Sequence, residues 1–391
     1  MSSTVRIGIA GFGTQGSMYA KFVAEGRVEG MTLGAIADVD PARRAVAGTD
    51  FSDVPLHEDV IDMLDSGDVD AIVTTVPHYL HPELAIAAME RGVHVLVEKP
   101  AGVYGRQVEQ MNAVAAAHPE LQFGVMFNQR NNPLYRRLKE IVEAGEIGRI
   151  IRSNWIITTW WRPQGYYDQS AWRATWGGEG GGVLVNQAPH QLDLWQWICG
   201  VPLSVFAKVS YGLQRDIAVE DEVTVLADFG GGSTGVFVTA THDLVGTDRL
   251  EIQGDAGKIV VEGSKVATVT RLREPERDLS AGLGMDQVRQ LFRGQLDSTQ
   301  FHTQETIEFA SQWGEQHVGV LANFAAAVLH GEPLLAPGAD GLLGVRLANA
   351  VHLSSWTGQE VGLDFDDDLF LKLLNERITE EGLFPARDTG R

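Results

Sequence analysis

The sequence lacks the features that mark several classes of protein. A single cysteine, Cys199, excludes an intramolecular disulfide and a zinc site built from several cysteines. No apolar run approaches the roughly 18 residues that cross a membrane. The first residues lead into an apolar segment without the basic stretch of a secretory signal. We therefore expect a cytoplasmic protein with no membrane contact.

Positive charge is also scarce. Lysine and arginine number 31 against 52 aspartates and glutamates, which gives a formal net charge of −21. This charge repels nucleic acids and anionic lipids at long range, so we expect no nucleic-acid partner. The acidic run at residues 364–368 is more typical of a solvated turn or a helix start than of a metal site, and we expect no metal.

What is present is an ordinary globular composition, in a chain of 391 residues that is long enough for two domains. Near its start, a glycine-rich turn joins an apolar run at residues 5–10 to a potential helix at 17–23. The turn reads Gly11-Phe12-Gly13-Thr14-Gln15-Gly16. Gly11 permits the tight turn, Gly13 lets a pyrophosphate approach, and Gly16 lets the helix pack on the strand. Together with the free N–H groups of the helix start, the turn predicts a dinucleotide site.

The residue after the second apolar run bears on which dinucleotide binds. Asp38 follows this run and stands 22 residues beyond Gly16. A carboxylate there accepts hydrogen bonds from ribose hydroxyls and disfavours a 2′-phosphate, which predicts NAD. Arg43 and Arg44 follow and would suit a phosphate, so NADP stays open as the second choice. Asp38 can also be a simple loop carboxylate.

Further apolar strands, at residues 71–76 and 93–97, alternate with a helix at 82–90. This alternation predicts a parallel, doubly wound sheet in a first domain over residues 1–127. Ligands bind at the carboxyl ends of such strands. The residues that this rule places on the ligand side are Thr75, Pro77, His78, His81, Glu98 and Lys99.

The pattern changes after residue 128 to consecutive strands separated by turns. The strand-like segments are 205–211, 222–229, 233–241, 249–253 and 258–262. They predict a second domain, 128–391, with a large, mostly antiparallel open sheet backed by helices, which makes the chain an α/β protein. The C-terminal segment could pack back on the first domain. An open sheet needs a cover, which favours a homodimer or homotetramer.

Seven of the nine tryptophans fall between residues 155 and 197. Pyranose rings stack their C–H faces on aromatic planes, so this stretch predicts a sugar or glycoside site. Trp155, Trp195 and Trp197 are expected in the core. The aromatic candidates for substrate contact, with a partner subunit as the alternative, are Trp160, Trp161, Tyr166, Tyr167, Trp172 and Trp176.

Positive charge gathers in the same stretch. Residues 149–176 hold four arginines and one aspartate, and Arg162 and Arg173 lie among the tryptophans. A guanidinium there can bind a carboxylate, sulfonate or phosphate. It can instead stack on the rings or pair with a partner subunit. A neutral and an anionic pyranoside therefore both stay open.

These residues together resemble the Gfo/Idh/MocA family of oxidoreductases over nearly the whole chain. The motifs that carry the resemblance are the glycine-rich turn, Pro77 with His81, residues 92–100 ending in Glu-Lys-Pro, residues 145–148, the triple glycine 180–182 with His190 and Asp193, and residues 219–221. The resemblance implies a Rossmann domain that binds NAD(P) and a second α/β domain. It also implies oxidation or reduction of a sugar or cyclitol hydroxyl, and dimers or tetramers.

The resemblance also implies roles for individual residues. Lys99 and His190 would contact the reacting hydroxyl, with the histidine as base and the ammonium polarising the oxygen. Asn186 stands where many members carry aspartate; it can position a hydroxyl but cannot take its proton, and it can also cap a helix. Asp193 either orients His190 or caps a neighbouring segment.

Asn128 and Arg130 occupy the first crossing between the domains, where the resemblance places them in the cleft near the nicotinamide. Two other functions stay open. One is a glycoside hydrolase that uses NAD as a recycled oxidant, as relatives acting on N-acetylgalactosaminides and sulfoquinovosides do. It needs a further acid or base, for which Tyr166, Tyr167, Asp168 and Glu179 are available. The other is a non-catalytic NAD-binding regulatory protein, against which Lys99 and His190 argue.

Overall fold

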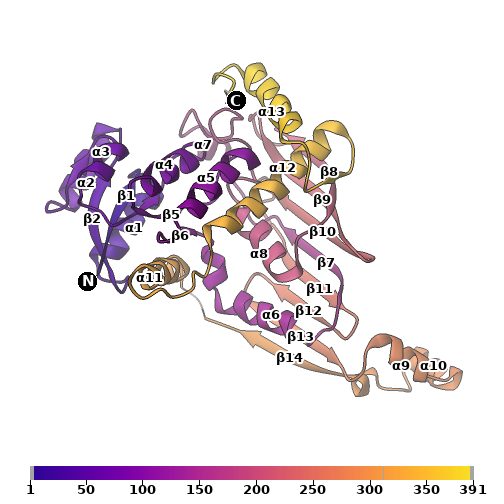
Figure 1. Cartoon of the computed structure of the whole chain (residues 1–391). Helices are drawn as coiled ribbons and strands as arrows, with labels where there is room; N and C mark the ends of the chain where they lie inside the picture. The colour runs from indigo at the N-terminus through magenta and orange to yellow at the C-terminus, as the bar shows by residue number, and fades with distance from the viewer. Residues whose placement is uncertain (1–3, 311, 388–391) are drawn as a thin grey trace.

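Two β-sheets organise the part of the chain that the computed structural model describes, residues 4–310 and 312–387 (Figure 1). The first sheet has the strand order β3-β2-β1-β4-β5-β6, and all its pairs are parallel. Its strands are β1 (Val5–Ala10), β2 (Met31–Ala37), β3 (Leu56–His57), β4 (Ala71–Thr74), β5 (His94–Val97) and β6 (Phe123–Val125). The expected parallel, doubly wound sheet is confirmed.

Helices cover both faces of this sheet, which is why its strands are continuous apolar runs. They are α1 (Thr14–Ala24), α2 (Pro41–Asp50), α3 (Val60–Asp65), α4 (Leu80–Met89) and α5 (Gly105–Ala117), followed by the short helix η1 (Asn128–Asn131). Helix α2 begins where it does because Asp40 accepts a hydrogen bond from Ala42 N and proline follows at the first helical position.

The second sheet has the order β14-β13-β12-β11-β7-β10-β9-β8-β15 and is antiparallel except for the β7–β10 pair. Its strands are β7 (Ile150–Ile157), β8 (Ser204–Tyr211), β9 (Glu220–Gly230), β10 (Ser233–Ala240), β11 (Asp248–Gly254), β12 (Gly257–Glu262), β13 (Val266–Leu272), β14 (His302–Glu308) and β15 (Val361–Gly362). The large, mostly antiparallel sheet is confirmed.

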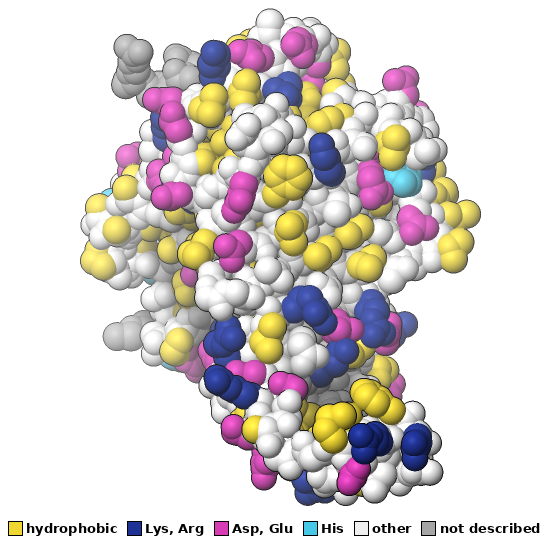
Figure 2. Space-filling view, turned by 90° about the vertical axis from the view of Figure 1, so that its right-hand side faces the viewer, with side chains coloured by type: hydrophobic (Ala, Val, Ile, Leu, Met, Phe, Trp, Pro, Cys, Tyr) yellow, Lys and Arg dark blue, Asp and Glu magenta, His cyan; other side chains and the backbone are white. Residues whose placement is uncertain are grey.

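One face of the second sheet packs on helices, and the other is open. The covering helices are α6 (Pro133–Glu143), α8 (Pro189–Cys199) and α12 (Gly341–Thr357), which lie between the two sheets (Figure 1). Trp155 and Trp195 are buried in this core, as expected. Figure 2 shows the side of the molecule that lies on the right in Figure 1, where hydrophobic side chains lie among charged ones.

The C-terminal part of the chain returns to the first sheet. Helix α11 (Glu315–His330) places Val320, Leu321 and Phe324 in the same core as β1. Residue 128 therefore does not divide the two cores cleanly in sequence. Helix α13 (Asp367–Glu381) begins at the acidic run, because Asp366 accepts a hydrogen bond from Asp368 N.

Between β13 and β14 the chain forms an arm that points away from the rest of the molecule (Figure 1). It contains α9 (Glu276–Gly282), α10 (Met285–Phe292) and η2 (Ser298–Phe301), and neither α9 nor α10 buries a side chain. The remaining elements are α7 (Gln164–Tyr167) and η3 (Gly338–Asp340). Within the described residues, no helix has both the length and the apolar character to cross a membrane.

Candidate active site

The glycine-rich turn has the shape that a dinucleotide requires. Gly11 has a φ of +97°, and a side chain there would meet the Thr75 carbonyl oxygen. A side chain at Gly16 would collide with the Gly11 carbonyl oxygen. Helix α1 begins after Gly13 with no side-chain cap, so its first N–H groups are open to a pyrophosphate.

The end of β2 is tied to this turn through Asp38. Its carboxylate accepts hydrogen bonds from Phe12 N at 2.7 Å and from Asp40 N at 2.8 Å. The Thr75 hydroxyl donates to the Gly11 carbonyl oxygen at 2.5 Å and closes the other side. The glycine-rich turn, the start of α1 and the carboxylate at the end of β2 thus fit NAD. Asp38 lies where the adenosine ribose of NAD would lie.

His81 uses both ring nitrogens on backbone carbonyl oxygens, so neither is left for a hydrogen bond to a cofactor. Its Nδ1 lies 2.8 Å from the Pro100 carbonyl oxygen and its Nε2 lies 2.8 Å from that of Val76. Burial lowers the pKa of this ring to about 4. His81 therefore braces the loop after β5 against the end of β4, while His78 Nδ1 contacts the Glu179 carbonyl oxygen at 3.0 Å.

The loop after β5 holds Lys99 rigidly. Both oxygens of the buried Glu98 are occupied, one by the Tyr19 hydroxyl and the other by Lys99 N at 3.0 Å. The Lys99 ammonium donates to the backbone carbonyl oxygen of Asn186 at 2.7 Å. Burial lowers the pKa of Lys99, and the nearby carboxylates of Glu98 and Glu179 act in the opposite direction.

His190 lies near this ammonium, in the first turn of α8. Burial lowers the pKa of its ring well below the usual value, and the charge of Lys99 adds to this effect. The imidazole is therefore neutral at neutral pH and can accept a proton. Its Nδ1 is buried and has no hydrogen-bond partner among the described residues.

Asn186 is not a helix cap, so that alternative is wrong. Helix α8 begins at Pro189, and its N-cap position is Ala188. The Asn186 amide donates instead to Glu179 Oε1. Glu179 is only 2% exposed, and its other oxygen accepts from Ala174 N at 2.7 Å. Glu179, Asn186 and Lys99 thus form one buried chain of contacts.

Asp193 and Arg130 pair with each other, which corrects both predictions. Arg130 Nε and Nη2 donate to the two oxygens of Asp193 at 2.9 and 2.6 Å, and Nη1 donates to Asp340 at 2.6 Å. Burial raises the pKa of Asp193 to about 6, although Arg130 lowers it. Asp193 therefore does not orient His190, and Arg130, 3% exposed, is a clamp between η1, α8 and η3 rather than a substrate contact.

His317, which was not among the predicted site residues, is brought near Lys99 by α11. Asn128 Nδ2 donates to His317 Nε2 at 2.7 Å. Burial lowers the pKa of His317 to about 4, and the charge of Lys99 contributes. No local pattern could have identified it, because its position depends on the return of α11 to the first sheet.

Two of the aromatic candidates are core residues, so their assignment to the substrate is wrong. Trp176 is 4% exposed and donates from Nε1 to the Ala218 carbonyl oxygen at 3.0 Å. Tyr167 is buried, and its hydroxyl donates to Thr241 at 2.9 Å. Both lie in the core of the second sheet.

The other candidates surround two guanidinium groups. That of Arg173 lies 4.8 Å from the ring centroid of Tyr166 and 4.9 Å from that of Trp172, and donates to the Tyr166 hydroxyl at 2.8 Å. That of Arg162 lies 5.1 Å from the Tyr166 centroid. Trp160 and Trp161 supply carbonyl oxygens to Arg162 Nη1 at 3.3 and 3.1 Å, and the Trp161 side chain is exposed.

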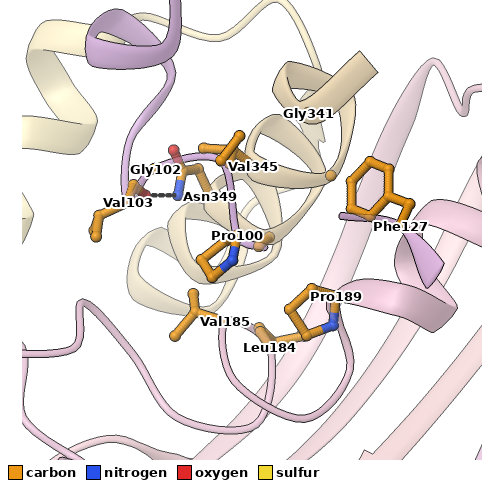
Figure 3. A pocket seen from close by; sticks show the side chains of 13 residues that line it. Pro100, Gly102, Val103, Phe127, Leu184, Val185, Pro189, Gly341, Val345 and Asn349 are labelled. Atoms are coloured by element: carbon orange, nitrogen blue, oxygen red, sulfur yellow. Dashed lines mark hydrogen bonds between the residues drawn. The ribbon is translucent and has the colours of Figure 1, made fainter. Parts of the chain in front are cut away.

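An apolar pocket lies behind the catalytic segments (Figure 3). Across the pocket, α12 faces Pro100, Val185 and Pro189. The segments that carry Lys99 and His190 therefore pack on the same helix. Among the residues that line the pocket, Asn349 has the one polar side chain, and both ends of its amide are bonded to the backbone at Val103 and Gly105. It offers no group for a sugar and serves packing.

Two family models match the chain. Residues 5–128 match the oxidoreductase family with an NAD-binding Rossmann fold, and residues 135–260 match the GFO/IDH/MocA C-terminal domain. Inositol 2-dehydrogenase of Rhizobium meliloti is 24% identical over 89% of this chain and 96% of its own length. Levoglucosan dehydrogenase of Pseudarthrobacter phenanthrenivorans is 28% identical over 58% of this chain and 63% of its own length.

Solved structures share the fold over almost the whole chain. A levoglucosan dehydrogenase in complex with NADH has a TM-score of 0.78 at 21% identity, covering 93% of this chain and 100% of the other. The WlbA dehydrogenase of Chromobacterium violaceum, in complex with NADH and UDP-GlcNAcA, has a TM-score of 0.77 at 26% identity, covering 94% and 98%.

Proposed function

The chain belongs to the Gfo/Idh/MocA family of oxidoreductases, and from that premise we propose that it is a dehydrogenase of a pyranose sugar or cyclitol. It would oxidise a secondary hydroxyl, or reduce the corresponding ketone, with NAD. The observation that carries the proposal is that the segments of Lys99 and His190 pack together on α12, with a neutral histidine near the ammonium. The inositol and levoglucosan dehydrogenases among the relatives support the substrate class.

The two residues divide the work on the reacting hydroxyl. His190 accepts the hydroxyl proton, because its depressed pKa keeps the ring neutral. Lys99 stabilises the negative charge that develops on the oxygen, in a buried site where one charge acts strongly. When bound, NAD supplies the hydride acceptor. The backbone carbonyl oxygen of Asn186 keeps the ammonium in place.

A panel of pyranoses and cyclitols with NAD tests the proposal through NADH formation. We expect NADH from at least one member, and its loss in His190→Asn but not in the control His118→Asn, which alters a histidine at the end of α5. Tight NAD binding without NADH from any sugar would favour the regulatory alternative and contradict the proposal.

Nitrophenyl glycosides separate the dehydrogenase from the hydrolase. Stoichiometric NADH without nitrophenol supports the dehydrogenase, whereas nitrophenol release with catalytic NAD and no net NADH supports the hydrolase. The second outcome would assign the additional acid or base to a group such as Glu179, which is buried beside Asn186.

Self-association through the open face of the second sheet is also part of the proposal. Phe206 and Leu226 are neighbours across β8 and β9, and they are 39% and 53% exposed. Ile156 on β7 is 39% exposed. A second copy that covers these side chains would remove them from water. Light scattering should show a dimer or tetramer that Leu226→Arg dissociates; a wild-type monomer would contradict this part.

A further inference from the structure

We propose that the substrate carries a carboxylate, and that Arg162 and Arg173 bind it at the edge of Tyr166. This inference rests on the proposed function and names the class of sugar, a uronic acid. We call the two side chains the arginine pair. Both guanidinium carbons lie within 5.1 Å of the same ring centroid, so they are within about 10 Å of each other.

The arginine pair adjoins the catalytic ammonium. Both guanidinium charges lower the pKa of Lys99, which places them close enough to repel it. Arg173 also lies 3.8 Å from Glu179 Oε1, and Glu179 contacts Asn186, which in turn contacts Lys99. A group bound by the pair would therefore sit beside the reacting hydroxyl.

The arginine pair is held in place but retains free donors. Arg162 uses Nη1 on two backbone carbonyl oxygens, and Arg173 uses Nη1 on the Tyr166 hydroxyl. Within the described part of the chain, Nε and Nη2 of both residues form no hydrogen bond. None of these four nitrogens is buried. Two ordered guanidinium edges with open N–H groups match the geometry of a carboxylate.

The charges around the arginine pair also favour an anion. Lys99 lies beside Glu98, and Arg173 lies beside Glu179, whereas Arg162 has no ion pair among the residues that the structure describes. His190 and His317 are neutral, because burial depresses the pKa of both. A positive charge without an ion pair, in a chain with a net charge of −21, favours an anion over a neutral sugar.

Matched sugars test the inference: glucuronate against glucose, galacturonate against galactose, and glucose 6-phosphate as the dianion. We expect kcat/KM with NAD to be higher for a uronate than for its neutral counterpart. Arg162→Gln and Arg173→Gln should each lower it by about 10- to 100-fold on the uronate, the worth of one charged hydrogen bond. On the neutral sugar the loss should be smaller than on the uronate, since no such bond is lost there.

The control is Arg152→Gln, an arginine of the same segment whose side chain is 49% exposed. Melting temperature and NADH affinity confirm that each variant folds. Equal losses on both classes, a wild-type preference for the neutral sugar, or a preference for glucose 6-phosphate would overturn the inference.

The proposed function can fail separately from this inference. If no sugar yields NADH, the dehydrogenase is wrong, and binding to the NADH-loaded protein decides the inference. Glucuronate should then raise the melting temperature of the wild type, glucose should not, and Arg162→Gln should abolish the effect. Equal shifts with both sugars, or none with either, would overturn it.

Discussion

The contacts that link Glu179, Asn186 and Lys99 can be tested by exchanging the carboxylate and the amide between positions 179 and 186. In the wild type, the Asn186 side-chain amide donates to the Glu179 carboxylate, and the backbone carbonyl oxygen of Asn186 accepts from Lys99. The variants are Asn186→Asp, Glu179→Gln and the double variant that carries both. The double variant keeps one carboxylate and one amide, and the single variants have two carboxylates or none.

The Asn186→Asp variant places two carboxylates in direct contact in a buried site. Two unit charges about 4 Å apart repel by about 4 kcal/mol at an effective dielectric constant of about 20. This energy corresponds to about three pKa units, so the pair keeps one proton to about pH 7 or above. The shared proton then replaces the amide hydrogen of the wild type. We expect activity near pH 6 that is lost as the pH rises through this raised pKa.

Removing the charge of Glu179 has a different effect. Glu179 raises the pKa of Lys99 against the opposing effect of burial. In Glu179→Gln the ammonium should therefore lose its proton at a lower pH, which shifts the alkaline limb of the kcat profile downward. The double variant should restore a limb close to that of the wild type.

Profiles of kcat and kcat/KM against pH, with NADH formation as the readout, measure these effects. Glu120→Gln, which alters an exposed carboxylate, is the control. An Asn186→Asp profile identical to that of the wild type would contradict the expected repulsion between the two carboxylates. A double variant no better than the worse single variant would show that the two side chains do not share one charge.

Three further predictions concern other parts of the site. In the wild type, the acidic limb of the kcat/KM profile should lie below the usual histidine range, because the pKa of His190 is depressed, and the alkaline limb should lie below the usual lysine range, because the pKa of Lys99 is also depressed. Limbs at the ordinary values would contradict the burial of both groups. Asp38→Ser should shift the preference from NAD towards NADP by about tenfold or more, because a carboxylate no longer repels a 2′-phosphate beside Arg43. Competitive binding of the two cofactors measures this shift, and an unchanged ratio would refute the role of Asp38. Asp193→Ala should lower the free energy of unfolding by about 3–5 kcal/mol, because it leaves one side of the buried Arg130 unpaired. Urea titration measures this loss, and a change below about 1 kcal/mol would show that Asp340 alone is enough to pair with Arg130.

The elements with strong local signals were predictable from the sequence. The strands of the first sheet are short apolar runs between glycines and helices, and the turn that begins at Gly11 needs residues with no side chain. The mostly antiparallel second sheet followed from strands that succeed one another without helices. These features depend on neighbours in sequence, which is why they could be inferred without knowledge of the packing.

The contacts within the site depend on packing between distant segments and were harder to infer. Asp193 is one turn from His190 along α8, yet it pairs with Arg130, 63 residues earlier, because η1 packs against that helix. Trp172 and Trp176 are four residues apart, but one lies beside Arg173 and the other is in the core. The arm at α9 and α10 was not predicted, and neither helix buries a side chain that would relate it to the core.

The most direct test of hydride transfer from a sugar to NAD follows a ring hydrogen of the substrate. The sugar that gives the most NADH is prepared with deuterium at every ring carbon, and the NADH formed is examined by mass spectrometry and NMR. The proposed function predicts one deuterium at nicotinamide C4 for each ketone produced, and no transfer in His190→Asn. NADH without deuterium, or sugar turnover without any transfer to the nicotinamide, would contradict it.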